Sequence, residues 1–178
     1  MIGNMQPEPP TGLARRRPIR FPSGPMATPR LSLGRAFGAS CIASAATTGL
    51  LFGVGRRAGH ALNAFSQAGR ILLDSRGVAD LLVPLATALV GLLHHLTAVL
   101  LWGTLIALVA GALRSVARIA ATVVLTAALW WASRQSLPVL GRIDLGVSDA
   151  GRLPIFVLMA VALLIGLWVA KPSRRQPG

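Results

Sequence analysis

The stretch LLVPLATALVGLLHHLTAVLLWGTLIALVAGAL, residues 81–113, decides the fold because it runs for 33 positions without a charged residue. One helix of that length would be about 50 Å long, whereas about 20 residues cross the roughly 30 Å hydrocarbon core of a bilayer. Two spans would need about 40 residues and a turn. The stretch therefore predicts a short interfacial or re-entrant segment over residues 81–90, a break at Gly91 and one span over residues 92–113.

The composition of the whole chain is typical of a membrane protein. Of its 178 residues, 53% are hydrophobic and 13% are charged, and the mean hydropathy is +0.64. Soluble domains usually contain about 25% charged residues. Further uncharged or nearly uncharged runs predict spans over residues 36–55, 115–133 and 153–170. We therefore expect an all-α polytopic membrane bundle of about four transmembrane helices over residues 36–170.

Basic segments flank this predicted membrane domain. Residues 1–35 are rich in proline and arginine and have no hydrophobic period, which predicts a disordered basic tail. Residues 171–178 form a second basic tail, and an amphipathic piece is expected around residues 61–73. We expect the tail arginines to face anionic lipid: Arg15, Arg16, Arg17, Arg174 and Arg175.

The distribution of the 18 basic residues predicts the orientation of the chain. With four spans and the N-terminus inside, 11 basic residues lie inside and 7 outside, whereas five spans would place 9 on each side. Basic residues accumulate on the cytoplasmic side of membrane proteins. The count favours four spans with both the N- and C-termini in the cytoplasm, and a bacterial inner membrane as the location.

Two adjacent histidines, His94 and His95, are the candidate cofactor ligands within the long apolar run. Neighbouring helical residues point about 100° apart, so the pair is unsuited to chelating one metal ion from one helix face. A haem or pigment ligand stays open as an alternative if another helix contributes. The favoured interpretation is that both histidines mark the outer membrane interface, with no cofactor and no metal site.

Enzymatic and nucleic-acid-binding functions find little support in the sequence. There is no GxSxG, HExxH, Walker loop or GxGxxG, and the single cysteine, Cys41, excludes an intramolecular disulfide and a CxxC motif. The arginines punctuate apolar segments and form no basic patch interleaved with aromatic residues, so no nucleic-acid partner is expected. We expect a protein that is not an enzyme.

Small residues spaced four apart occur in three of the four predicted spans. They let helix backbones approach closely, so they predict tight packing, either within the chain or against a partner. Alanine and glycine are common in this chain, so chance contributes some of these patterns. The predicted packing positions are Ala45, Gly49, Gly53, Gly103, Ala107, Gly111, Ala162, Gly166 and Ala170.

The layout resembles that of small, uncharacterised bacterial four-span inner-membrane proteins. The resemblance rests on the small-residue first span, on the Gly91-x-x-His94 sequence and on TAALWWASRQSLPVLGR, residues 126–142. It is a likeness of pattern over about residues 36–170, carries no diagnostic motif, and implies a helical bundle without implying an activity.

These observations together favour a non-enzymatic integral membrane protein, an accessory or structural subunit that packs against a larger membrane complex. Its expected partners are the bilayer with its anionic lipid, and other membrane subunits or a second copy of the chain. A small transporter or channel is an alternative, for which the threonines are the only candidate pore residues: Thr47, Thr48, Thr97, Thr104, Thr122 and Thr126. A haem- or pigment-binding subunit that uses His94 or His95 is the other alternative.

Overall fold

The computed structural model describes residues 33–74 and 83–169 of the chain. In these ranges the backbone forms five α-helices and one 3-10 turn. The elements are α1 (Leu33–Arg57), α2 (Asn63–Asp74), α3 (Pro84–Gly111), α4 (Ser115–Gln135), η2 (Val139–Gly141) and α5 (Asp149–Val169). Helices α1, α3, α4 and α5 are long and apolar enough to cross a membrane. The predicted class, an all-α polytopic bundle with four spans, is confirmed at this level of length and composition.

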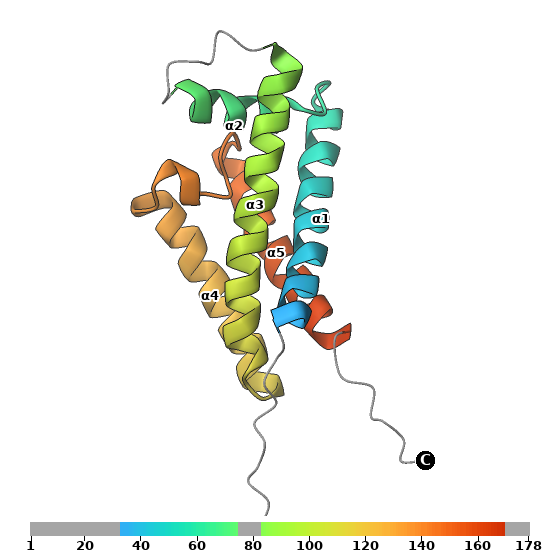
Figure 1. Ribbon diagram of the computed structural model, residues 1–178, viewed down its shortest axis with the longest axis vertical. Helices are drawn as coiled ribbons and strands as arrows, with labels where there is room; N and C mark the ends of the chain where they lie inside the picture. Colours follow the sequence, from blue (N-terminus) through green and yellow to red (C-terminus); the bar gives the residue numbers. More distant parts are fainter. Residues whose placement is uncertain (1–32, 75–82, 170–178) are drawn as a thin grey trace, which may run out of the picture.

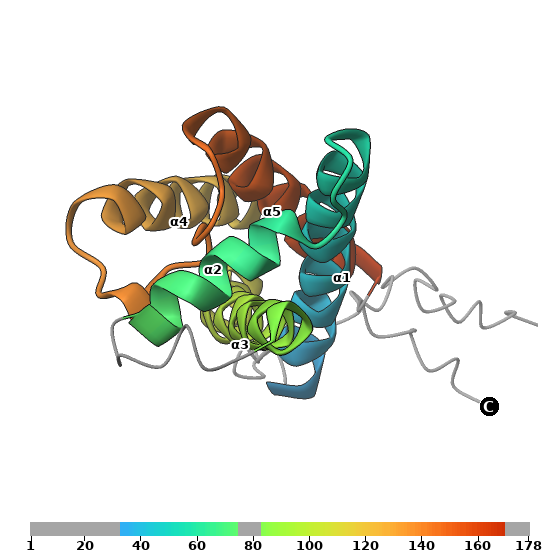
Figure 2. The same cartoon turned by 90° about the horizontal axis from the view of Figure 1, so that it is seen from above.

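The four long helices alternate in direction along the bundle (Figure 1). Helices α1 and α4 run one way and α3 and α5 run back, so the start of α1 and the end of α5 lie at the same end. We call this the chain-end side. Helix α2 lies across the opposite end, where it crosses α3 and connects to α1, as the view from above shows (Figure 2). An even number of spans places the start of the first span and the end of the last span on the same side.

Helix α3 corrects the prediction for residues 81–113. It is one continuous helix through Gly91, so the separate segment over residues 81–90 was wrong; residues 84–90 form the first turns of α3, and residues 81–82 lie outside the described ranges. A glycine inside a helix costs only about 1 kcal/mol, whereas breaking the helix would expose backbone polar groups to lipid. Pro84 stands in the first turn, where its missing N–H costs nothing.

The other predicted elements agree with the structure to within a few residues. Helices α1, α4 and α5 correspond to the spans predicted at 36–55, 115–133 and 153–170, and α2 corresponds to the amphipathic piece. Helix α1 begins earlier than predicted, so residues 33–35 are helical and not part of a tail. Residues 1–32 and 170–178 lie outside the described ranges, and with them both predicted basic tails, their five arginines and Ala170.

The core forms mainly where α1 packs against α3 and α5. The face of α1 that meets them carries small side chains, which lets the helix axes come close. These buried residues are Ala36, Ala39, Ser40, Ala43, Ser44 and Thr47. Two glycines complete the contact, because a Cβ at Gly103 would lie 2.9 Å from Ser40 Cβ and one at Gly166 would lie 2.6 Å from Ala39 Cα.

Candidate functional site

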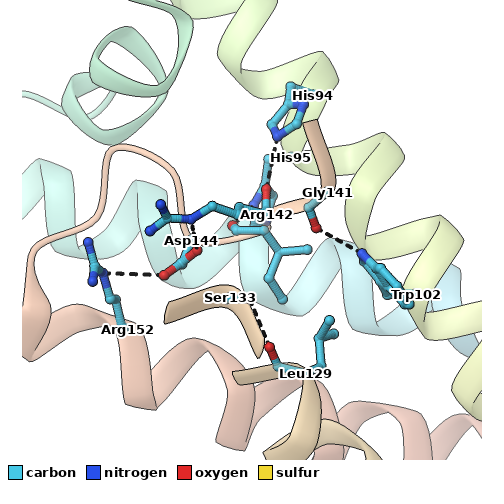
Figure 3. A network of polar contacts seen from close by, with 10 residues as sticks. His94, His95, Trp102, Leu129, Ser133, Gly141, Arg142, Asp144 and Arg152 are labelled. Carbon is cyan, nitrogen blue, oxygen red and sulfur yellow. Dashed lines mark hydrogen bonds and ion pairs between the residues drawn. The ribbon is translucent and has the colours of Figure 1, made fainter. Parts of the chain in front are cut away.

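The loop between α4 and α5, residues 136–148, is held on α3 through three consecutive backbone carbonyls (Figure 3). Trp102 Nε1 donates to Gly141 O at 2.9 Å, and His94 Nε2 donates to Arg142 O at 2.9 Å. His95 Nδ1 donates to Ile143 O at 3.1 Å. The two candidate ligands of the sequence therefore both contact this loop, although they are adjacent on one helix. They can do so because the loop passes across α3 and offers each ring a different carbonyl.

The His95 imidazole is buried in the bundle and contacts protein through both ring nitrogens. His95 is 3% exposed, and Thr47 Oγ1 on α1 lies 3.1 Å from its Nε2. A carbonyl oxygen only accepts, so Nδ1 carries a proton, and in the neutral ring Nε2 accepts from the Thr47 hydroxyl. Phe65 of α2 packs edge-on, with ring centroids 5.9 Å apart. A haem or pigment on His95 would have to displace Thr47.

An ion-pair cluster fastens the same loop to α5. Asp144 is 0% exposed, and its carboxylate oxygens lie 3.4 Å from Arg142 Nε and 3.3 Å from Arg152 Nε. Both arginine side chains remain about one quarter exposed, at 25% and 26%. A buried carboxylate needs such partners, because an unpaired buried charge is strongly destabilising. The cluster therefore fixes the loop on the first turn of the last span (Figure 3).

The buried position of Asp144 was not predicted from the sequence. A carboxylate in a loop next to arginines is ordinarily a solvated residue, and nothing in its immediate neighbours marks it as buried. The one available signal was the spacing of Arg142 and Asp144, two apart, followed by Arg152 at the start of a span.

Gly146 completes the contact of this loop with α2. Its φ is +71°, a backbone conformation that residues with a Cβ rarely adopt. A Cβ there would also collide with the carbonyl oxygen of Ala64 and would lie 2.5 Å from the amide nitrogen of Ala68. The loop thus touches α2 through Gly146, α3 through its carbonyls and α5 through Asp144. We call this region, with the α2–α3 crossing, the crowded end.

Helix α2 crosses α3 through a pair of glycines at the crowded end. A Cβ at Gly69 would collide with the carbonyl oxygen of Thr87, and one at Gly91 would collide with that of Phe65. Each helix therefore presents its bare backbone to the other. Gly91, predicted to be a helix break, is instead one of the two glycines at which the backbones of α2 and α3 come closest.

The threonines proposed as pore candidates bond mostly to their own helices. Thr97 donates to Leu93 O, Thr122 to Arg118 O, and Thr126 to Thr122 O. Such back-bonding satisfies a hydroxyl in an apolar environment without a channel. Thr47 lies beside the His95 ring, Thr104 shares a hydrogen bond with Ser40, and the Thr48 hydroxyl has no hydrogen-bond partner in the described chain.

The predicted small-residue positions divide into two groups. Gly103, Ala107, Gly111, Ala162 and Gly166 are buried or contact α1, as described above for the two glycines. Ala45, Gly49 and Gly53 on α1 are exposed, and a Cβ at either glycine would meet no atom within 4 Å. Because α1 packs through its opposite face, this stripe points away from the bundle.

The exposed stripe on α1 is longer than the three residues predicted from the sequence. Exposed small residues continue it toward the start of the helix at Gly34, Gly38 and Cys41, with spacings of three or four. We call the six residues the outer α1 face: Gly34, Gly38, Cys41, Ala45, Gly49 and Gly53. Spacings of this kind place side chains along one side of a helix.

The outward faces of α3 and α5 carry large aliphatic side chains instead. On α3 these are Leu85, Leu89, Leu93, Leu101, Leu105 and Val109, and on α5 they are Leu153, Val157, Val161 and Ile165. Large aliphatic side chains are what lipid tails contact on a membrane helix, whereas small residues are enriched where helices meet. The outer α1 face therefore differs in kind from the outward faces of α3 and α5.

Comparison with protein-family models, with curated proteins and with solved structures gives no match to this chain. Among the described residues, no group of three or more His, Cys, Asp or Glu side chains is placed to hold a metal ion.

Proposed function

We propose that the protein is a non-enzymatic accessory or structural subunit, and that the outer α1 face packs against a transmembrane helix of a larger membrane complex. The observation that carries the proposal is the contrast between this face and the aliphatic faces of α3 and α5. A helix that presents six small residues to lipid forgoes dispersion contacts that leucine or valine would make. A partner helix that approaches closely would restore them.

The chemistry of the partner follows from this geometry. Stripes with a spacing of four support right-handed crossings in which backbones nearly touch. The partner is expected to offer either small residues of its own or a narrow apolar ridge. The large side chains at the margins of the face, Phe37 and Ile42, would then flank the partner helix.

The test uses Gly49→Leu with Val157→Leu as the matched control. Both positions are exposed, and a Cβ at Gly49 meets nothing within 4 Å, so both variants should fold. The native protein is purified in a gentle detergent, and subunits that co-purify at fixed stoichiometry are identified by mass spectrometry. We expect Gly49→Leu to remove them and Val157→Leu to keep them. Equal recovery with both variants would contradict the proposal.

Cys41 supplies an independent test, because it is the only cysteine and is exposed on the outer α1 face. A thiol-linked photo-crosslinker on Cys41 in native membranes should join the chain to the same subunit that co-purifies. The control moves the thiol to α5 in a Cys41→Ser, Val157→Cys variant, which should crosslink to lipid. Crosslinking of the same subunit from both positions would contradict a specific face.

We further propose a bacterial inner membrane with both termini in the cytoplasm, on the charge asymmetry alone. In a Cys41→Ser background, single cysteines at Ser75 and Ser148 should react with a membrane-impermeant reagent added from outside. Cysteines at Arg16 and Ser173 should react only after the membrane is opened. Labelling of Arg16→Cys from outside would show that the N-terminus faces outward and would contradict the proposed orientation.

A further inference from the structure

A second feature of the bundle, independent of the outer α1 face, is a cleft between α1 and α5. The two helices touch where Gly166 meets Ala39, near the chain-end side, and the cleft lies about 22 Å farther along α1, at Val54. Its volume is about 450 Å³, and α2 and residues 146–148 cover its upper end. Leu50, Leu51 and Val54 of α1 form one wall, and Pro154 and Ile155 of α5 form the other.

The lining of the cleft changes from apolar to polar along its length. The walls are aliphatic, whereas the cover brings Asn63 and Gln67 of α2, which share a hydrogen bond of 3.3 Å, and Ser148 of the loop. Helix α2 is itself amphipathic, with Phe65 and Leu72 buried and Arg70 exposed, as expected of a helix lying in the membrane interface. The cleft therefore has its polar end at the headgroup level and its apolar walls at acyl-chain depth.

The charge at the rim favours an anionic headgroup. Arg57 is the last residue of α1 and is exposed, and it directly precedes Ala58, which lines the cleft. It also follows Leu50 by seven residues and Val54 by three, so helix geometry places it near the end of the α1 wall. No acidic residue lines the cleft among the residues whose side chains the structure describes. The buried carboxylate of Asp144 already pairs with Arg142 and Arg152, so it does not offset Arg57.

We propose that the α1–α5 cleft binds one acyl chain of an anionic phospholipid, with the lipid phosphate beside Arg57. The size of the cleft, its apolar walls, its polar cover and the arginine at its rim all match this one ligand. The proposal depends on the membrane location of the bundle and not on the partner of the outer α1 face, so either can fail without the other.

The experiment places the full-length protein in phosphatidylcholine nanodiscs doped with a photoactivatable lipid. The probe carries a diazirine on one acyl chain close to its ester group, on either phosphatidylglycerol or phosphatidylcholine, and crosslinked peptides are mapped by mass spectrometry. We expect the phosphatidylglycerol probe to label peptides containing Val54 and Ile155 about fivefold more than the phosphatidylcholine probe, the factor expected for one arginine beside an anionic headgroup.

Two matched pairs of variants separate the cleft from the general lipid surface. Val54→Trp fills the cleft and should abolish this labelling, whereas Val157→Trp, at an equally exposed valine on the outer surface of α5, should not. Arg57→Gln should remove the preference for phosphatidylglycerol, and Arg56→Gln should retain it. If Val54→Trp fails to fold, Ala58→Leu narrows the rim and should give the same loss. Equal labelling by the two probes, or unchanged labelling in the filled cleft, would overturn the proposal.

Discussion

The crowded end and the outer α1 face are both built with glycine, but in opposite surroundings. At the crowded end, Gly69 and Gly91 let the backbones of α2 and α3 touch, and a Cβ at either would collide with a carbonyl oxygen. On the outer α1 face, a Cβ at Gly49 or Gly53 meets nothing within 4 Å. A glycine inside a helix costs about 1 kcal/mol relative to alanine. At the crowded end, close helix contact within the chain offsets this cost. On the outer α1 face, the chain itself provides no such contact.

The largest effect is expected from Gly91→Ala at the crowded end. Its new methyl group would collide with backbone of α2, which cannot yield as a flexible side chain could, so α2 must shift or detach. We expect a loss of about 3 kcal/mol of unfolding free energy, despite the better helix propensity of alanine. Unfolding in detergent, followed by far-ultraviolet circular dichroism, measures it. A variant as stable as the native protein would mean that α2 does not rest on Gly91.

A somewhat smaller loss is expected when the loop is released from α5. Asp144→Asn keeps the size of the side chain but leaves Arg142 and Arg152 without their counter-charge. Removing one partner of a buried pair costs about 3–5 kcal/mol, and the partial exposure of both arginines lowers this to about 2–3 kcal/mol.

The double variant Asp144→Asn, Arg142→Gln provides the control for Asp144. It removes one unpaired charge and should recover part of the lost unfolding free energy. Equal stability of the single and double variants would show that the pairing with Arg142 contributes little, and would leave Arg152 as the partner that matters.

The histidines contribute less, and unequally. His95→Ala removes a buried ring, leaves Ile143 O without its donor, and should cost about 2 kcal/mol. His94→Ala removes one hydrogen bond at a half-buried position and should cost about 1 kcal/mol. The two variants are compared in the same unfolding assay. If His94→Ala proved the more destabilising, the loop would be held mainly at Arg142 O and not at the buried ring.

The spans could be predicted from the sequence because a helix that crosses lipid must be long and mostly apolar. Long runs with little or no charge locate α1, α4 and α5, and the charge count favoured an even number of spans. The length of α3 could not be predicted in the same way, since 33 uncharged residues fit one long helix or a broken one. The role of Gly91 was equally hidden, because it meets the carbonyl oxygen of Phe65 on α2, a contact between separate helices that leaves no local pattern.

The polar contacts of the loop were less predictable for a related reason. His94, His95 and Trp102 all donate to backbone carbonyls, and a carbonyl is present at every residue, so the partner cannot be identified from residue types. Small residues four apart are ambiguous in the same sense. They predict close approach at Gly166 and at Gly49 alike. Only the three-dimensional arrangement shows that Gly166 meets Ala39 of another helix, whereas a Cβ at Gly49 would meet nothing within 4 Å.

The smallest effect, and the one opposite in sign, is expected from Gly49→Ala on the outer α1 face. Alanine improves helix propensity, and its methyl group meets no neighbour, so the isolated chain should gain up to about 1 kcal/mol of unfolding free energy. Gly166→Ala is the matched control within the bundle, because its methyl group would meet Ala39 and should destabilise the protein. Both variants are measured by unfolding in detergent, where the chain is separated from its partners. A loss at Gly49 equal to that at Gly166 would mean that the outer face already contacts the bundle, and the contrast between filled and open glycines would no longer hold.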